Sequence, residues 1–235
     1  MIYFPLFLIL GCVLIALGVV QQGWTWLDVW LGIDFLALGV AHGLSAHRVF
    51  GKRADGTLPL WSWLVFLPLF TLTWTVWYLL RIFIREPPYV AVNEQLVVGR
   101  RLFAAEVREH FDNYVDLTAE FADPAAIRTT SAYRAFPILD ACAPSVDALH
   151  SAIGGLRPGR TFVHCAQGHG RTGLFALAVL LSSGATQDVD EGLRILRAAR
   201  PGIRLNKSQR RCVEAYAVMV ARQVVDTENH AGQES

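Results

Sequence analysis

The segment HCAQGHGRTG, residues 164–173, places one cysteine six residues before one arginine, with two glycines between them. The apolar run just before it, 160–164, predicts a strand, and the run that starts at Arg171 and continues through LFALAVLL predicts a helix. The segment should therefore be a loop between the carboxyl end of a strand and the amino end of a helix. Free backbone N–H groups and the helix dipole attract anions to such a loop, so we expect a site sized for a phosphate.

Cys165 lies at the base of this predicted loop, and Arg171 lies at its far end. Gly168 and Gly170 permit backbone angles at which successive amides converge on one anion. The planar guanidinium of Arg171 can bind two phosphate oxygens at once. The same amides and the helix dipole favour the thiolate form of Cys165 over the thiol. A thiolate beneath a bound phosphoryl group is a nucleophile in line for attack on phosphorus.

Residues 164–173 resemble the Cys-x5-Arg-Ser/Thr signature of the protein-tyrosine phosphatase superfamily and are most similar to its dual-specificity branch. The strand and histidine before the cysteine, both glycines and the Thr-Gly after the arginine carry the resemblance, which extends from about Leu96 to Tyr216. It implies an α/β catalytic domain and no cofactor. No metal is implied, because Arg171 and the loop amides meet the charge of the phosphate.

The resemblance also implies a role for each residue of the loop. Cys165 would form a cysteinyl-phosphate, and Arg171 would hold the phosphate in the ground and transition states. Thr172 would hydrogen-bond the thiolate and aid its departure in the second step, while His164 would orient the loop and favour the thiolate. The substrate phosphate would be bound by Ala166, Gln167, Gly168, His169, Gly170 and Arg171.

Members of this superfamily use an upstream aspartate as general acid. The segment YRAFPILDACAP, residues 133–144, resembles that region and makes Asp140 the candidate, because it follows a predicted strand. The alternative for Asp140 is a turn or helix-cap carboxylate. Asp123 and Asp147 are the weaker candidates for the acid.

Three more residues of the C-terminal part are candidates for auxiliary roles. Asn206 and Gln209, in RPGIRLNKSQRR, resemble residues that close the active site in family members, and they fit a helix cap equally well. Cys142 follows Asp140 by two residues, so it could form a protective disulfide with Cys165. The alternative for Cys142 is a small buried residue.

The N-terminal third has a different composition from the rest of the chain. The 235 residues are 53 % hydrophobic and only 17 % charged, and the apolar excess lies before about residue 85. Two or three apolar helical segments, 2–20, 29–47 and 59–84, therefore predict a membrane domain over residues 1–84. The first lacks a positively charged start and a cleavage site, which favours a retained anchor over a signal peptide.

The basic residues leave the membrane topology open. One cluster consists of Arg48, Lys52 and Arg53, and a later one of Arg81, Arg85, Arg100 and Arg101. The positive-inside rule places both clusters on the cytoplasmic side, yet a full crossing by 59–84 would put them on opposite sides of the membrane. In one arrangement Pro68 breaks this segment into a re-entrant or interfacial hairpin. In the other, all three segments cross.

Residues 85–94 are predicted as a linker, 95–225 as the dual-specificity phosphatase-like domain, and 226–235 as a frayed polar tail. Strand-like runs at 95–99, 113–117, 133–139 and 160–165 alternate with helical patterns that begin near residues 145, 171, 189 and 206. Such alternation predicts N-terminal transmembrane helices followed by an α/β domain, with a mostly parallel central sheet flanked by helices.

The sequence thus predicts a membrane-anchored phosphomonoester phosphatase whose partners are the lipid bilayer and a phosphorylated protein or phospholipid. The net charge of +1 gives no indication of nucleic-acid binding. The anchored layout resembles bacterial membrane phosphatases of this branch, which implies an inner-membrane protein with its catalytic domain in the reducing cytoplasm.

Three alternatives stay open. The first is a lipid-specific phosphatase, acting on phosphatidylglycerophosphate or a phosphoinositide-like lipid. His169 stands where a phosphoinositide phosphatase group has lysine, and a basic group there suits an anionic headgroup. The others are a rhodanese-like sulfur transferase and a non-catalytic membrane scaffold with a phosphatase fold.

Overall fold

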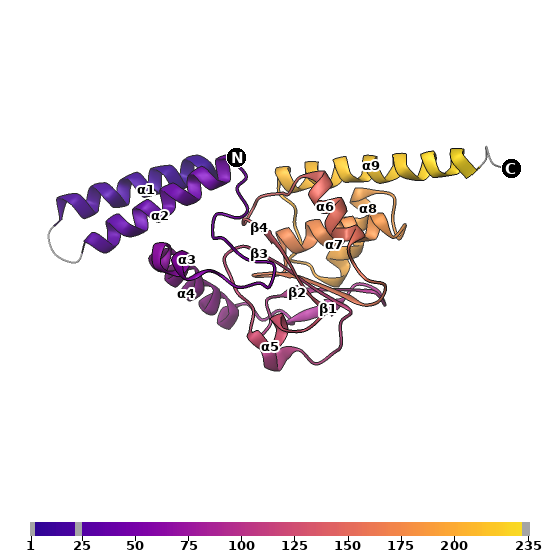
Figure 1. Ribbon diagram of the computed structural model, residues 1–235, viewed down its shortest axis with the longest axis horizontal. Helices are drawn as coiled ribbons and strands as arrows, with labels where there is room; N and C mark the ends of the chain where they lie inside the picture. The colour runs from indigo at the N-terminus through magenta and orange to yellow at the C-terminus, as the bar shows by residue number, and fades with distance from the viewer. Residues whose placement is uncertain (1–2, 22–24, 232–235) are drawn as a thin grey trace.

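The computed structural model describes residues 3–21 and 25–231, and its C-terminal part is an α/β unit built on one sheet (Figure 1). In these residues five strands pair in the order β1-β2-β5-β3-β4. Their bounds are β1 Tyr89–Ala91, β2 Leu96–Arg100, β3 Asn113–Thr118, β4 Tyr133–Ile138 and β5 Thr161–Cys165. The first pair is antiparallel and the other pairs are parallel, so the prediction of a mostly parallel sheet is confirmed.

Helices cover both faces of this sheet. They are α5 Ala125–Arg128, α6 Val146–Gly154, α7 Gly170–Ser182, α8 Val189–Ala199 and α9 Lys207–Ala231, with a 3-10 turn η1 at Ala104–Glu106. Helices α6 to α9 lie on one face, and α5 lies beyond the other (Figure 1). Every residue of β5 is buried, which explains why its sequence is a continuous apolar run and not an alternating one. Cys165 is the last residue of this central strand, so it lies at the carboxyl ends of the parallel strands.

Side-chain caps start three of these helices where the sequence predicts them. The Ser145 hydroxyl accepts a hydrogen bond from the Ala148 amide at 3.2 Å. The Asp188 carboxylate accepts one from the Glu191 amide at 2.7 Å, and α9 begins directly after Asn206. The end of α9 differs from the expectation, because the helix continues to Ala231 through most of the predicted polar tail; residues 232–235 lie outside the described part.

The predicted linker is not a plain connection. Residues 85–94 contain β1, a three-residue strand that extends the sheet beyond β2, and the Arg100 amide donates to the Pro88 carbonyl at 2.9 Å. A strand this short leaves almost no alternating pattern in the sequence. Pairing with the free edge of β2 determines its conformation.

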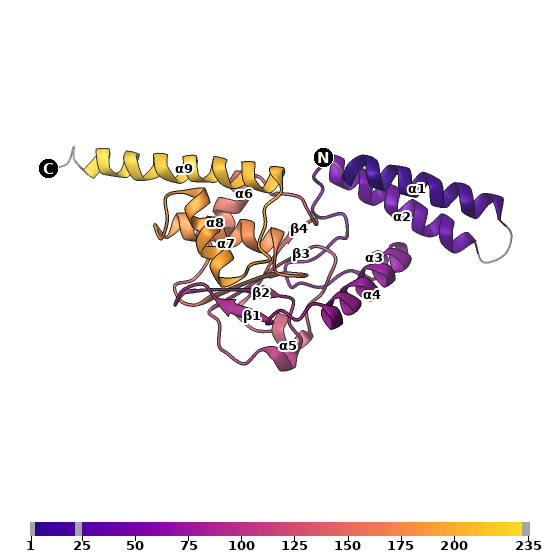
Figure 2. The same ribbon diagram turned by 180° about the vertical axis from the view of Figure 1, so that it is seen from behind.

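The N-terminal part forms two helical pairs. Helices α1 (Tyr3–Val20) and α2 (Trp26–Gly43) lie side by side in both views (Figures 1 and 2). A Cβ on Gly11 would lie 2.7 Å from the carbonyl oxygen of Gly32, so the two backbones touch at this crossing. Close contact through small residues is typical of helices that pack within lipid.

Of the helices that the structure describes, α1 alone is long and apolar enough to cross a membrane. The prediction of two or three such helices is therefore not confirmed. The segment 59–84 is divided into α3 (Leu60–Val65) and α4 (Leu67–Phe83), with a break at Phe66. Pro68 lies in the first turn of α4, so the segment is interrupted beside this proline, as in the first of the two arrangements; the hairpin itself stays a prediction.

The loop between α2 and α3 packs on the α/β unit. Lys52 is buried, with its Nζ 2.5 Å from Asp116 Oδ2 and 2.6 Å from the carbonyl oxygen of Thr118. Nearby, the Leu139 amide donates to His47 Nδ1 at 3.3 Å. Lys52, read in the sequence as part of a basic turn, is thus an internal cation whose partner lies 64 residues away.

The same ion pair makes stability depend on pH. Burial alone would raise the pKa of Asp116, but the charge of Lys52, followed by that of His164 and by hydrogen bonds, lowers it below its usual value. A carboxyl whose pKa is lower in the folded state stabilises the fold above its unfolded pKa of about 4. This contribution is lost as the pH falls below that value.

We expect Lys52→Met to lower the free energy of unfolding by about 3–5 kcal/mol, because it leaves the Asp116 carboxylate buried without its cation. The measurement is the thermal midpoint of the full chain at neutral pH. Arg53→Met, an exposed neighbour on the same loop, is the matched control and should change the midpoint little. Equal midpoints for the two variants would contradict a stabilising role for the buried pair.

Candidate functional site

The loop between β5 and α7 surrounds the thiol of Cys165. The Gly168 amide donates to Cys165 Sγ at 3.3 Å, and α7 begins two residues later at Gly170. Gly168 has φ +78°, and a Cβ there would lie 2.4 Å from the Gly99 carbonyl oxygen, so only glycine fits. The buried thiol thus lies beside a helix N-terminus, and its sulfur accepts a backbone hydrogen bond.

Arg171 is fully enclosed and carries its own acidic partner. Its Nη1 and Nη2 donate to the two carboxylate oxygens of Glu120 at 2.9 and 2.8 Å, and Nη1 also donates to the Ile138 carbonyl at 3.0 Å. Burial lowers the pKa of Arg171, but the charges of Glu120 and then Asp140 outweigh it and raise the pKa well above its usual range. The guanidinium is therefore held charged and in a fixed plane.

Sequence reasoning missed Glu120. It lies just beyond the carboxyl end of β3, and parallel strands end at the same edge of a sheet. An acidic residue directly after a predicted parallel strand could therefore have been recognised in the sequence as a candidate neighbour of the loop that follows β5.

Asp140 follows β4 and reaches the same place. Its Oδ1 lies 3.2 Å from Arg171 Nη2, while its side chain is 80 % exposed. It can therefore face both a bound substrate and water. The weaker candidates lie elsewhere: Asp123 is buried in an ion network, and Asp147 is exposed in the first turn of α6.

One cavity of about 510 Å³ brings these groups together. Cys165, Arg171, Asp140 and Glu120 line it, and four further residues of the loop do so as well: Ala166, Gln167, His169 and Gly170. A nucleophile, a fixed cation and a carboxyl group in one cavity can hold a phosphate, displace its ester oxygen and handle a proton.

His164 and Thr172 are both fully buried beside the loop. His164 Nε2 lies 3.0 Å from Asp123 Oδ2, and its Nδ1 lies 3.4 Å from the Cys165 carbonyl oxygen. These two contacts fix the position of the imidazole ring at the end of β5. The Thr172 hydroxyl has no hydrogen-bond partner within the described residues. The bond to the thiolate that the resemblance implies is not formed in this structure.

A buried acidic cluster lies behind the loop. Ligand atoms of Asp116, Asp123 and His164 lie within 4.8 Å of one another, a spacing that a metal ion could bridge. However, Lys52 pairs with Asp116, and Arg101 Nε lies 3.1 Å from Asp123 Oδ1. Because these cations already neutralise the carboxylates, the cluster does not fit a metal site.

Asn206 and Gln209 form the predicted helix cap and also contact the segment after Asp140, while their predicted role in closing the active site stays a prediction. The Gln209 amide donates to Asn206 Oδ1 at 2.9 Å, and the Asn206 amide donates to Gln209 Oε1 at 3.1 Å, which caps α9. Asn206 Nδ2 also donates to the Ala141 carbonyl at 2.7 Å, and Gln209 Nε2 to that of Cys142 at 3.3 Å. Ala141 has φ +58°, so the two amides hold a strained segment directly after Asp140.

His169 and its loop are tied to the predicted linker. His169 Nε2 lies 2.8 Å from Glu86 Oε2, and Arg200 Nη2 lies 2.7 Å from the same oxygen. Arg200 also donates to the Gln167 carbonyl at 3.0 Å. Glu86 was not predicted as a site residue, and its charge offsets that of a basic His169.

Cys142 and Cys165 are both free thiols here. Burial raises the pKa of Cys142, and the nearby charge of Asp140 raises it further against a smaller opposing effect of Arg171. Cys142 therefore stays a thiol at neutral pH, which disfavours its attack in disulfide exchange. The predicted protective disulfide remains a hypothesis.

Solved structures share this fold. Tk-PTP in its active form superposes with a TM-score of 0.50 at 24 % identity, covering 56 % of this chain and 97 % of its own. PTPMT1 in complex with PI(5)P gives 0.52 at 12 % identity, covering 59 % and 99 %, and a variant of human DUSP28 gives 0.52 at 20 %, covering 59 % and 99 %. No protein-family model and no curated protein matches the sequence.

These similarities show that the C-terminal part of the chain shares its fold with Tk-PTP, PTPMT1 and DUSP28, which is the dual-specificity phosphatase fold. They cover nearly the whole of each neighbour but little more than half of this chain.

Proposed function

We propose that the protein is a membrane-anchored phosphatase that hydrolyses phosphomonoesters through a cysteinyl-phosphate at Cys165. The observation that carries the proposal is the meeting of Cys165, Arg171 and Asp140 in one cavity of a dual-specificity phosphatase fold. Glu120 holds the arginine fork in the plane that two phosphate oxygens require.

In the first step Arg171 and the loop amides bind the phosphate, and Cys165 Sγ attacks phosphorus. The bond between phosphorus and the ester oxygen breaks, and Asp140, protonated, gives its proton to that oxygen. In the second step Asp140 accepts a proton from water, whose oxygen attacks phosphorus. The S–P bond breaks, which releases inorganic phosphate and returns the thiolate.

Two rival functions are less well supported. A sulfur transferase does not need Arg171 with Glu120 behind it, or a carboxyl group at the position of Asp140. A non-catalytic scaffold would not need the nucleophile, the cation and the acid together, yet all three line the cavity.

The N-terminal surface supports membrane anchoring. Among the described residues, every large hydrophobic side chain that is exposed lies before residue 84, with the single exception of Val218. Such a concentration of exposed apolar side chains in one part of the chain is typical of a membrane or protein contact. We place the membrane domain at 1–84 and the catalytic domain at 95–225, in an integral protein of a bacterial inner membrane.

The packing of the α2–α3 loop favours one of the two topologies. Residues 47 and 52 contact the catalytic domain, and Arg81 at the end of α4 donates to the Arg101 carbonyl at 3.1 Å. Both ends of 59–84 therefore meet the same domain, which supports a re-entrant or interfacial segment over a full crossing. Both basic clusters would then face the cytoplasm with the active site.

The proposed substrate is a phosphoprotein or a membrane phospholipid. PTPMT1, which has the same fold, was solved in complex with PI(5)P, and this supports a phospholipid as one of the two candidates. The test is phosphate release by the full-length protein from phosphatidylglycerophosphate, a phosphoinositide, a phosphotyrosine peptide and a phosphothreonine peptide. The proposal would be overturned if the protein released phosphate from none of these substrates and also released none from a small aryl phosphate.

Asp140→Asn should lower kcat by about 10²–10⁴-fold on an alkyl phosphate, because the leaving alkoxide then lacks its proton donor. With an aryl phosphate, whose leaving oxygen needs little protonation, the loss should be much smaller. Asp147→Asn, an exposed aspartate outside the cavity, is the matched control. Equal losses on the two substrates would argue that Asp140 acts on the structure of the loop and not as the acid.

A further inference from the structure

The cavity above Cys165 extends well beyond the phosphate-binding loop. Its polar end is formed by Cys165, Arg171, Glu120 and Asp140. Apolar side chains of the N-terminal helices form much of the remaining wall: Phe7 on α1, Phe35 and Leu38 on α2, and Leu69, Leu72, Val76 and Leu80 on α4. Helices that were expected to serve as an anchor thus build one side of the candidate active site.

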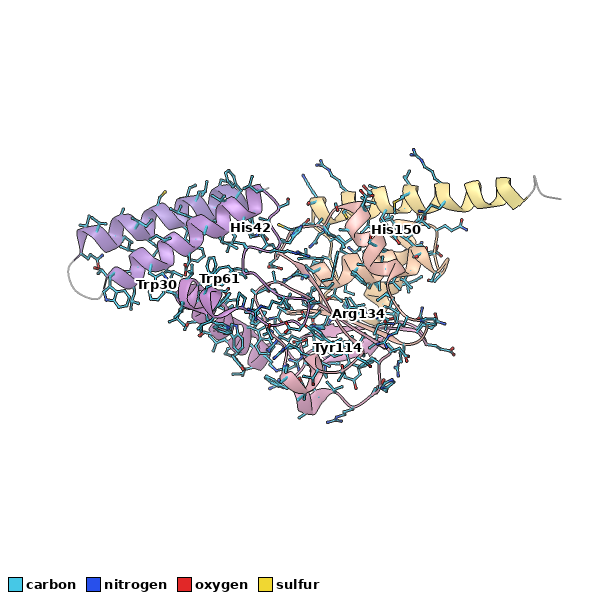
Figure 3. The ribbon with its side chains drawn as sticks, in the orientation of Figure 1. Trp30, His42, Trp61, Tyr114, Arg134 and His150 are labelled. Carbon is cyan, nitrogen blue, oxygen red and sulfur yellow. The ribbon has the colours of Figure 1, made fainter. Side chains whose placement is uncertain are left out.

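Hydrogen bonds fix these helices to the two catalytic loops. Trp77 Nε1, on α4, donates to the Ala166 carbonyl of the phosphate-binding loop at 3.0 Å. His42 Nε2, at the end of α2 that faces the catalytic domain (Figure 3), lies 3.0 Å from the Asp140 carbonyl oxygen. The apolar wall therefore has a defined position relative to both the nucleophile and the acid.

The cavity also borders the apolar exterior. Leu72, Val76 and Leu80 follow one another at four-residue spacing and so lie along one face of α4. Each of them lines the cavity, and each is also at least 38 % exposed. This row is the boundary between the cavity and the surface that we assign to the bilayer, so a hydrocarbon chain can pass there without crossing water.

The shape of the cavity restricts the group attached to the phosphate. A phosphate on the loop directs its ester oxygen into the cavity, whose wall on the N-terminal helices consists mostly of leucine, valine and phenylalanine side chains. Of the polar side chains there, His42 and Trp77 already contact backbone carbonyls, so Tyr3 and Thr73 leave few partners for peptide N–H and C=O groups. Burying such groups without hydrogen bonds is unfavourable, whereas burying methylene groups is favourable. A ligand that fills this cavity must therefore be amphiphilic, with a phosphate at its polar end and a hydrocarbon group along its apolar wall.

Building on the proposed function, we propose that the cavity between α4, the α1–α2 pair and the phosphate-binding loop binds the hydrocarbon chain of an amphiphilic phosphomonoester. The phosphate lies at Cys165 and Arg171, and the chain lies along Val76 and its neighbours on α4. The substrate class is therefore a membrane-soluble phosphate lipid, and the N-terminal helices are part of its binding site.

The test uses the full chain in phosphatidylcholine bilayer discs, which avoids detergent in the cavity, and a series of monoalkyl phosphates from butyl to dodecyl. For the wild type, kcat/KM should rise by about fourfold per added methylene until the cavity is filled. Val76→Trp and, independently, Leu72→Trp fill part of the cavity and should reduce the dodecyl-to-butyl ratio of kcat/KM by about tenfold or more. Leu79→Trp, on the outer side of α4, should keep the wild-type ratio.

Several results would overturn the proposal. A wild-type series without chain-length dependence would do so, as would a phosphotyrosine peptide turned over faster than dodecyl phosphate. Equal ratios in the wild type and in both tryptophan variants would also overturn it, because the dependence would then reflect partition into the bilayer alone.

A binding measurement separates this proposal from the proposed function. Labelled dodecyl phosphate is bound to the Cys165→Ser protein alone and to the same protein with Val76→Trp or with Leu72→Trp. Binding that Val76→Trp weakens supports the chain site even if no substrate is hydrolysed. Binding that neither tryptophan variant changes contradicts the chain site even if butyl phosphate is hydrolysed.

Discussion

Cys165→Ser is expected to abolish phosphate release, with kcat falling by a factor on the order of 10⁴ or more. The serine hydroxyl keeps nearly the same volume and can still accept the Gly168 amide hydrogen bond, but it stays protonated and is a weak nucleophile. The measurement is release of inorganic phosphate by the full-length protein from an aryl phosphate and from dodecyl phosphate. A phosphoryl-enzyme trapped by acid quench should form in the wild type and be absent in the variant.

The chain offers a matched control for this substitution. Cys12→Ser changes an exposed cysteine on α1, far along the sequence from the loop, and should leave turnover unchanged. Residual activity of Cys165→Ser within tenfold of the wild type would mean that another group attacks phosphorus, and the cysteinyl-phosphate mechanism would be rejected.

Arg171→Lys should lower kcat/KM by about 10³-fold although the positive charge is retained. A lysine ammonium is a point charge that cannot bind both oxygens of Glu120 and present two parallel N–H groups to a phosphate. Inorganic phosphate, the product, should also inhibit the variant more weakly. Rate and inhibition constants are measured on the same preparation.

Arg210→Lys is the control for a lost arginine fork. Arg210 also contacts two carboxylates, Asp190 at 2.9 Å and Glu214 at 2.7 Å, but it lies exposed on α9 away from the cavity. Its replacement should leave kcat/KM within twofold of the wild type, as expected for an exposed ion pair. If Arg171→Lys behaved in the same way, a bidentate role for Arg171 would be excluded.

Local patterns explain which elements could be predicted. The continuous apolar run of β5 is typical of a strand that is buried on both faces. Ser145 and Asn206 each begin a helix by accepting a hydrogen bond from a backbone amide three residues further on. The glycines of HCAQGHGRTG similarly permit the backbone angles of the loop, such as the φ of +78° at Gly168. Such signals lie within a few residues of the element that they determine.

Contacts across the chain explain what was missed. Glu120 lies 51 residues before Arg171, Glu86 lies 83 before His169, and Lys52 lies 64 before Asp116. No periodicity links such partners, and an isolated acidic or basic residue is most often a solvated surface charge. Lys52 was read in that way, as a charge that sets membrane topology.

The sequence by itself determined that a loop with Cys165 and Arg171 joins a strand to a helix, that β2 to β5 and α6 to α9 form, and that the N-terminal third is apolar, because each depends on residue types at short spacing. Only the tertiary structure decided that Glu120 holds Arg171, that both ends of 59–84 meet the catalytic domain, and that α4 forms a wall of the cavity. Each of these results from buried ion pairs and hydrogen bonds between distant segments, whose partners are selected when the whole chain packs.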